Sequence, residues 1–334
     1  MAMSDYGYPS APAGNPTGQT PMHQPPPVYP KLDVGDVLQT SAGLVAKNFA
    51  SFLAVAVLFA TPGIILSGIL AKIVMGSMVA LQQAAMNGDF GGLIDAFPMT
   101  SVILSIAGGF VNAVLVYTGM GTLMYAAVES LAGRQHSVGE VLSHGLRSAP
   151  SVAIVAVVIM VAQTVAMLPG LMAITLGSIG ATSGGFEALL CCLLPTGLLM
   201  LLVPFVYVVI LLFLAIPSAV LEGIGPITAL SRSVQLTKGH RGTIFLIMFI
   251  VGLVMLILSV ILSMLGGAGM NQIDPTTMQF QEPTMFAFLM SLITQYIMAI
   301  FRIIVIGSLA SVIYARIRGL KDGVDANAIA QVFS

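Results

Sequence analysis

The sequence predicts an all-α polytopic membrane protein with six transmembrane helices, arranged as three repeats of an interfacial amphipathic helix plus a helical hairpin. Apolar residues make up 57% of the chain and charged residues 7%, which excludes an ordinary soluble domain. Six apolar runs each reach the roughly 20 residues that a helix needs to cross a hydrocarbon core of about 30 Å. A short amphipathic segment also precedes every second run.

The chain begins with a segment that is not expected to fold. Residues 1–30 are rich in Pro, Gly, Ser, Tyr and Gln and nearly lack aliphatic side chains, so they bury too little apolar surface to offset the entropy of ordering. We expect a disordered cytoplasmic tail that is either solvated or a proline-rich docking ligand. The first apolar run begins near Phe49 with no charged segment or cleavage site before it, so we expect no removable signal peptide.

The membrane domain is predicted to occupy residues 31–321, followed by a short cytoplasmic tail at 322–334. The predicted spans are 49–73, 100–128, 150–176, 189–216, 243–266 and 286–315. Lys and Arg gather before the odd-numbered spans and after the sixth, whereas the opposite loops are acidic and, apart from Lys72 at a span end, lack Lys and Arg. The positive-inside rule therefore predicts that both termini are cytoplasmic.

The predicted repeat unit begins with an interfacial helix. Residues 37–45, 138–146 and 227–234 carry apolar side chains at helical spacing before the first, third and fifth spans. The helix-start signals are Asp33 with Asp36, Ser137 with Glu140, and Gly225 with Pro226. The interfacial basic residues are Lys47, Arg147, Arg232, Lys238 and Arg241. We expect these cations to hold the helices flat on an anionic membrane surface.

A charge also closes each predicted repeat. Glu129, Glu222 and Arg318 stand at the cytoplasmic ends of the second, fourth and sixth spans. Repeated units usually pack around a shared centre, so these residues are expected to form a charged cluster at the inner face. The cluster has two interpretations, which are salt bridges that set the helix register and a ligand site.

Three segments resemble the membrane domain of glycerophosphoryl diester phosphodiesterases, and related uncharacterised bacterial inner-membrane proteins are similar. The segments are Val34-Gly-Asp-Val-Leu with Lys47-Asn-Phe, Val203-Pro-Phe with Ala219-Val-Leu-Glu-Gly-Ile-Gly-Pro-Ile-Thr-Ala-Leu-Ser-Arg-Ser-Val-Gln-Leu-Thr-Lys-Gly, and Tyr314-Ala-Arg-Ile-Arg with Asp322-Gly-Val-Asp325. The likeness covers nearly everything after residue 31.

The resemblance implies a membrane domain that stands alone, in a bacterial inner membrane. In the enzymes of that family a separate soluble barrel carries catalysis with a metal and paired His and Glu or Asp residues, and this chain has no segment for that barrel. The histidines are His23, His136, His144 and His240, and none is framed by metal-ligand carboxylates. We therefore expect no phosphodiesterase activity, no metal and no cofactor.

Arg302 is the charged residue deepest in a predicted span. A charge at that depth costs at least about 2.5–3.5 kcal/mol unless it finds partners. Asn112, Gln163 and Tyr207 are neutral polar residues at a similar depth in other spans. Gln295 lies in the same span as Arg302, on the same helix face. A guanidinium surrounded by such groups suits an anionic head group or phosphate. In the alternative interpretation, Arg302 bonds helix carbonyls, Gln295 or Glu187 and simply locks the bundle.

The leading functional hypothesis is a non-enzymatic integral membrane module, a scaffold or accessory factor in envelope or lipid homeostasis that holds an anionic lipid at Arg302. The alternative is a small transporter or flippase for a lipid or an anionic solute, which the internal repeat and the mid-span prolines favour. The expected partners are anionic membrane lipids and a cytoplasmic or membrane protein. No nucleic acid is expected.

Overall fold

The computed structural model describes residues 32–86, 99–134, 137–182, 187–266 and 284–323, and every element in these ranges is an α-helix. The helices are α1 (Val34–Lys47), α2 (Phe49–Met86), α4 (Met99–Leu131), α5 (Val138–Thr182), α6 (Glu187–Leu212), α7 (Ala215–Leu221), α8 (Pro226–Thr237), α9 (Arg241–Gly266) and α10 (Met285–Asp322). The predicted tail at 1–30 and most of the tail at 322–334 lie outside the described residues.

Six stretches of the described helices are long and apolar enough to cross a membrane, and each overlaps one predicted span. They are Phe49–Ser77, Met99–Leu131, Val138–Ile174, Pro195–Leu221, Arg241–Met264 and Met285–Asp322. Large apolar side chains such as Ile65, Leu199 and Met264 are exposed on their outer surfaces, as expected where helices face lipid. The chain is therefore a multi-pass membrane protein with six candidate spans in its described part.

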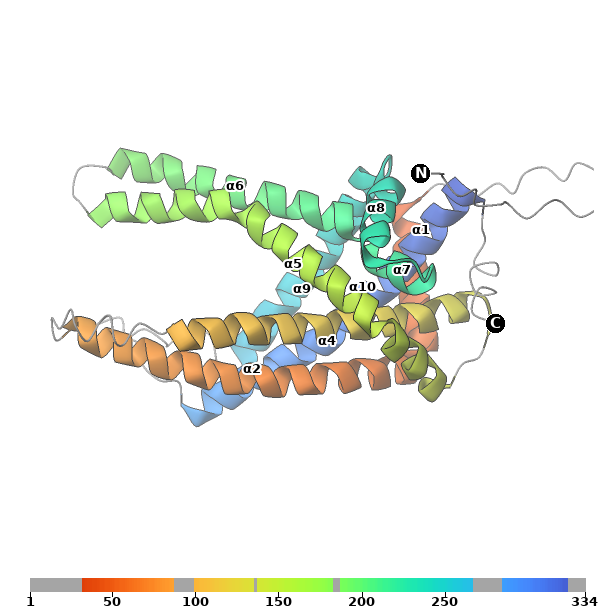
Figure 1. The fold of residues 1–334 in the computed structure, drawn as a ribbon, viewed down its shortest axis with the longest axis horizontal. Coiled ribbons are helices and arrows are strands. Elements are labelled where there is room, and N and C mark those ends of the chain that lie inside the picture. The colour runs from red at the N-terminus through yellow and green to blue at the C-terminus, as the bar shows by residue number, and fades with distance from the viewer. Residues whose placement is uncertain (1–31, 87–98, 135–136, 183–186, 267–283, 324–334) are drawn as a thin grey trace, which may run out of the picture.

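The long helices converge at one end of the bundle, and α5 and α6 diverge from α2 and α4 toward the other end (Figure 1). The short helices and the last turns of α10 gather where the long helices converge. We call that end the α1/α8 end and the opposite one the distal end. Helix α4 contacts α2, α5 and α10, which places it at the centre of the packing. Buried residues are concentrated in the last turns of α4 and α10. The tightly packed core therefore lies in the half of the bundle nearest the α1/α8 end.

The three predicted helix starts are confirmed. Asp33 caps α1 by accepting a hydrogen bond from the Asp36 N–H at 3.0 Å. The Ser137 hydroxyl accepts one from the Glu140 N–H at 3.2 Å at the start of α5. Gly225 is the N-cap of α8, with Pro at the first helical position, where its missing N–H leaves no bond unmade.

The prediction of a separate interfacial helix before the third span is wrong, because α5 continues from Val138 to Thr182. The other two units have a break at this point, at Asn48 between α1 and α2 and around Gly239 between α8 and α9, where φ is +90°. Residues 147–149, Arg-Ser-Ala, supply no comparable break. Gly145 also packs tightly on α4, since a Cβ there would lie 1.9 Å from the Thr122 Oγ1 atom. The first turns of α5 are thus held against α4.

The fourth span, which was predicted to be one helix, is broken between α6 and α7. The Ser233 hydroxyl of α8 donates a hydrogen bond to the Leu211 carbonyl at 2.7 Å and accepts one from the Leu214 N–H at 3.2 Å. Pro217 has no N–H to donate to the Phe213 carbonyl, so a continuous helix would lack that bond. A side chain on a neighbouring helix therefore satisfies the backbone at the break.

We predict that Ser233→Ala destabilises the protein by about 1–3 kcal/mol, because the buried Leu214 N–H loses its acceptor. The measurement is the temperature at which half of the detergent-solubilised protein has aggregated. Ser231→Ala on the exposed side of the same helix is the control and should leave that temperature unchanged. Equal temperatures for the two variants would contradict the role given to Ser233.

Candidate functional site: a cavity facing Arg302

A cavity of about 240 Å³ lies among α4, α5, α6, α7, α9 and α10, and the Arg302 side chain lines it. The other polar groups in its wall are the Gln163 amide of α5 and the Tyr117 phenol of α4. The rest of the wall is mostly apolar, with Met120 and Ile306 among the lining residues. The cavity therefore combines a single cation with two neutral hydrogen-bonding groups in an apolar setting.

Arg302 has no protein partner in the described part of the chain. Its side chain is exposed and makes no hydrogen bond or ion pair there. The charge of Arg302 interacts with the phenol of Tyr117. A phenol can donate or accept a hydrogen bond, but it has no negative charge that would neutralise the guanidinium. The guanidinium thus keeps all its N–H groups available to an occupant of the cavity.

The partners expected for a purely structural Arg302 lie too far away. Gln295 precedes Arg302 by seven residues on α10 and lines a different cavity. Glu187 begins α6, and Val209, which lines the Arg302 cavity, lies about 33 Å further along that helix. An arginine side chain cannot reach over that distance.

Two independent helices place this site in the middle of the membrane. Arg302 precedes Tyr314 by twelve residues on α10, which corresponds to about 18 Å along the axis. Tyr117 precedes Glu129 by the same number on α4. Tyr314 and Glu129 both belong to the α1/α8 end, and the hydrocarbon core is about 30 Å thick. Both side chains of the site therefore lie roughly halfway through it.

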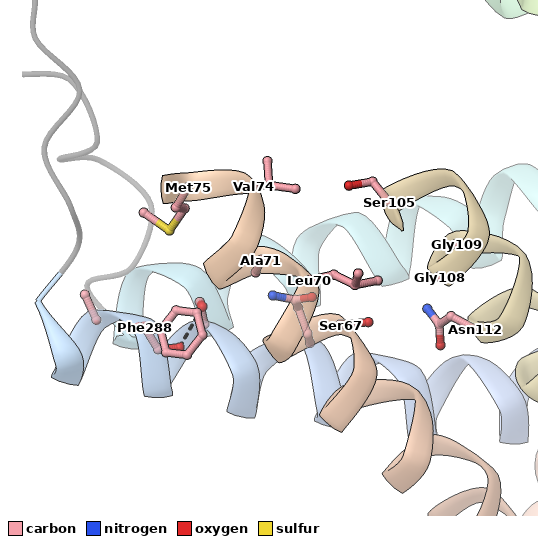
Figure 2. A pocket seen from close by; sticks show the side chains of 13 residues that line it. Ser67, Leu70, Ala71, Val74, Met75, Ser105, Gly108, Gly109, Asn112 and Phe288 are labelled. Carbon is pink, nitrogen blue, oxygen red and sulfur yellow. Dashed lines mark hydrogen bonds between the residues drawn. The ribbon is translucent and has the colours of Figure 1, made fainter. Parts of the chain in front are cut away.

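The residues predicted to bind a ligand lie in three separate places in the structure. Gln163 shares the cavity with Arg302, as predicted. Asn112 and Gln295 instead line a cavity of about 480 Å³ between α2, α4 and α10 (Figure 2). Tyr207 is exposed on α6, where its hydroxyl accepts a hydrogen bond from the Arg241 guanidinium at 3.3 Å. The sequence reasoning missed Tyr117, although its depth, equal to that of Arg302, could have revealed it.

Two of the three residues predicted to form the inner charged cluster are connected, through Tyr314. The Glu222 carboxylate accepts hydrogen bonds from the Tyr314 hydroxyl at 2.7 Å and from the Arg232 Nε at 3.3 Å. The Arg318 guanidinium donates to the same Tyr314 hydroxyl at 3.2 Å. Asp322 pairs with both Arg232 and Arg318. We call these five residues the Glu222 network; it fastens α8 to the end of α10.

Glu129, the third residue, is not part of this network. It is buried and pairs with Arg134 at 3.8 Å. Of the predicted interfacial basic residues, Lys47, Arg147 and Lys238 are exposed, whereas Arg241 contacts Tyr207. No group of three or more His, Cys, Asp or Glu residues in the described ranges could hold a metal ion.

Arg232 of the Glu222 network stays charged. Burial favours a lower pKa for the Arg232 guanidinium, but the carboxylates of Glu222 and Asp322 outweigh burial and raise that pKa above its ordinary value. Arg232 is therefore a permanent cation that pairs with Glu222. The partners of Glu222 are a tyrosine hydroxyl and a guanidinium already in place, so this network serves the packing of the helices.

We predict that Tyr314→Phe lowers the free energy of unfolding by about 1–3 kcal/mol, because it deletes the donor to the Glu222 carboxylate and the acceptor for Arg318. Thermal unfolding in detergent micelles measures the loss. Tyr207→Phe removes an exposed hydroxyl and serves as the control, with an expected effect near zero. If Tyr314→Phe were as stable as Tyr207→Phe, the Glu222 network would not fasten the helices as described.

Comparison with known proteins identifies a family but no characterised relative. No curated protein and no solved structure matches the chain. The family model of a domain of unknown function, DUF7847, matches residues 32–316, which run from the start of α1 into the last turns of α10. The chain therefore belongs to the DUF7847 family.

Proposed function

We propose that this protein is a non-enzymatic membrane module that binds an anionic lipid at Arg302 and acts as a scaffold or accessory factor in envelope or lipid homeostasis. The observation that carries the proposal is the Arg302 guanidinium, which lines a mid-membrane cavity and has no acidic partner in the described structure. A cation in hydrocarbon costs at least about 2.5–3.5 kcal/mol without partners. An anion bound in the cavity removes that cost.

The chemistry of the cavity suits a phosphate or carboxylate head group. Arg302 offers a planar fork of donors that matches two oxygens of such a group. The Gln163 amide and the Tyr117 hydroxyl supply further donors in the same wall. The volume of about 240 Å³ admits a head group and not a whole lipid, so the acyl chains would lie along the apolar outer surfaces of the spans.

The distribution of charge supports an inner-membrane location with the α1/α8 end in the cytoplasm. Apart from Lys72 and Arg302, every described Lys and Arg lies at or near that end. Basic residues are retained on the cytoplasmic side, where anionic lipids attract them. The exposed Lys47, Arg147 and Lys238 are then the cations that face the anionic head groups.

The family likeness and the repeat belong to the same proposal. The chain would be a stand-alone relative of the membrane domain of glycerophosphoryl diester phosphodiesterases, with three units formed by α1, α2 and α4, by α5, α6 and α7, and by α8, α9 and α10. The three confirmed helix starts at equivalent places support this division. A cytoplasmic or membrane protein partner would dock at the α1/α8 end.

A transporter or flippase is the second candidate, and one observation favours it. The cavity at Asn112 and Gln295 and the cavity at Arg302 are lined by the same two helices, α4 and α10, at successive depths. Gln295 and Arg302 are seven residues apart and thus lie on one face of α10. Two cavities in line are what a path across the membrane requires.

Arg302→Met should abolish the preferential retention of anionic lipid. Native mass spectrometry of protein extracted from its own membrane measures the bound lipid, and we expect a loss of roughly fivefold or more in the variant, since a charge-assisted pair is removed. Arg147→Met removes one of several exposed cations at the α1/α8 end and is the matched control, with a much smaller loss of anionic lipid than in Arg302→Met because the other surface cations remain. The proposal fails if Arg302→Met stays folded and carries as much anionic lipid as the control.

Cysteine labelling separates the two candidate functions. In a background in which Cys191 and Cys192 are replaced by Ser, single variants Asn112→Cys and Gln163→Cys are treated with a membrane-impermeant maleimide from each side in turn. A lipid-holding module predicts that neither cysteine is labelled from both sides. Labelling of the same cysteine from both sides would indicate alternating access and favour the transporter.

A further inference from the structure

The larger cavity, which we call the distal cavity, has a different chemistry from the cavity at Arg302. It has a volume of about 480 Å³ and lies between α2, α4 and α10 (Figure 2). Its polar lining residues are Ser67, Ser105, Asn112, Ser291 and Gln295. None of its lining residues is charged. The wall of the distal cavity is therefore polar but neutral.

The hydrogen-bonding state of these side chains defines what they can still bind. The hydroxyls of Ser67, Ser105 and Ser291 each donate to a carbonyl of their own helix, at 2.9, 2.6 and 2.7 Å. Their oxygens keep lone pairs that can accept. The amides of Asn112 and Gln295 make no hydrogen bond with any described residue. Each amide therefore offers two N–H donors and a carbonyl acceptor.

The position of Asn112 is built into the helix packing. A Cβ at Gly63 of α2 would lie 2.4 Å from the Asn112 Oδ1 atom, so a larger residue at position 63 would displace the Asn112 amide from its present position. Figure 2 shows Asn112 and Ser67 pointing toward one another across the cavity. Donors and acceptors from two helices thus converge on the same space. Such a neutral mixture matches hydroxyl groups, which both donate and accept.

A cation lies beside the cavity. Lys72 follows Ala71, a lining residue, and its Nζ atom lies 4.5 Å from the centroid of the Phe288 ring, which also lines the cavity. The ring contact holds the ammonium group near the wall. A ligand whose hydroxyls occupy the cavity would therefore meet a positive charge at its edge.

The depth of the cavity corresponds to lipid head groups. Ser67 follows Asn48, at the α1/α8 end of α2, by nineteen residues, or about 28 Å along the axis. Ser105 precedes Glu129 by twenty-four residues on α4, or about 36 Å. The hydrocarbon core is about 30 Å thick, and the head-group regions extend the bilayer to about 40–45 Å. The distal cavity therefore lies where the core meets the distal head groups.

We propose that the distal cavity binds the hydroxyl-bearing head group of an anionic phospholipid from the leaflet at the distal end. The amides of Asn112 and Gln295 and the serine oxygens bond the hydroxyls of this phosphatidyl polyol, and Lys72 pairs with its phosphate. A lipid is the occupant because the cavity lies at head-group depth and the helices around it are apolar on their outer surfaces. This site does not depend on Arg302.

The test compares two lipids that differ in hydroxyl groups and not in charge. The purified full chain, freed of lipid in detergent, is titrated with phosphatidylglycerol and with phosphatidylmethanol of the same acyl chains, and native mass spectrometry gives the two affinities. We expect wild type to bind phosphatidylglycerol roughly fivefold or more tightly than phosphatidylmethanol, the gain of one or two hydrogen bonds. Gln295→Leu and Ser67→Ala should each lower this ratio toward one.

Two controls make the result specific. Lys72→Met should weaken both lipids alike and preserve the ratio, because it removes a charge and no hydroxyl partner. Arg302→Met should also preserve the ratio, since it belongs to the other cavity. Gel filtration checks that each variant is folded, and the exposed Gln295 provides the mildest change. The proposal is overturned if wild type binds both lipids equally, or if both Gln295→Leu and Ser67→Ala keep the wild-type ratio.

Discussion

A lipid bilayer offers no water to solvate a charge, and this constraint governs where the polar groups of the protein lie. Nearly all described charged side chains stand at the α1/α8 end, where the Glu222 network and the Arg316–Asp36 pair at 2.8 Å join α10 to α8 and α1. At the α6/α7 break, Ser233 of α8 bonds the Leu211 carbonyl and the Leu214 N–H, so these backbone groups are satisfied without water. Arg302 departs from this rule, since it lies at mid-depth without a partner in the described structure.

The six spans and the helix starts could be predicted because both depend on local sequence. Apolar runs of sufficient length define the spans, and Asp33, Ser137 and Pro226 act on the first turn of their own helices. The continuity of α5 and the break before α7 depend instead on neighbouring helices. Thr122 of α4 holds the start of α5, and Ser233 of α8 permits the break. Pro217 was the local sign of that break.

The candidate site was predicted in part, because counting residues gives depth only approximately. Arg302 and Gln163 do share a cavity. Gln295 faces the same side of α10 as Arg302 but lies about 10 Å further toward the distal end, which places it in another cavity. Between the two cavities, Val116 is buried and Ala299 packs against the core, and the Thr61 and Tyr296 hydroxyls join α2 to α10 at 2.9 Å. Packing at this level, which no local pattern encodes, separates one predicted site into two.

The central claim is that Arg302 is held unpaired by the protein in order to meet an anion. The most direct measurement is an electron cryo-microscopy structure of the protein in nanodiscs that contain anionic phospholipid. We expect non-protein density in the Arg302 cavity, with an oxygen-bearing head group about 2.7–2.9 Å from the guanidinium nitrogens. A cavity closed around Arg302, with its guanidinium bonded to protein carbonyls or to a carboxylate of the chain, would contradict it.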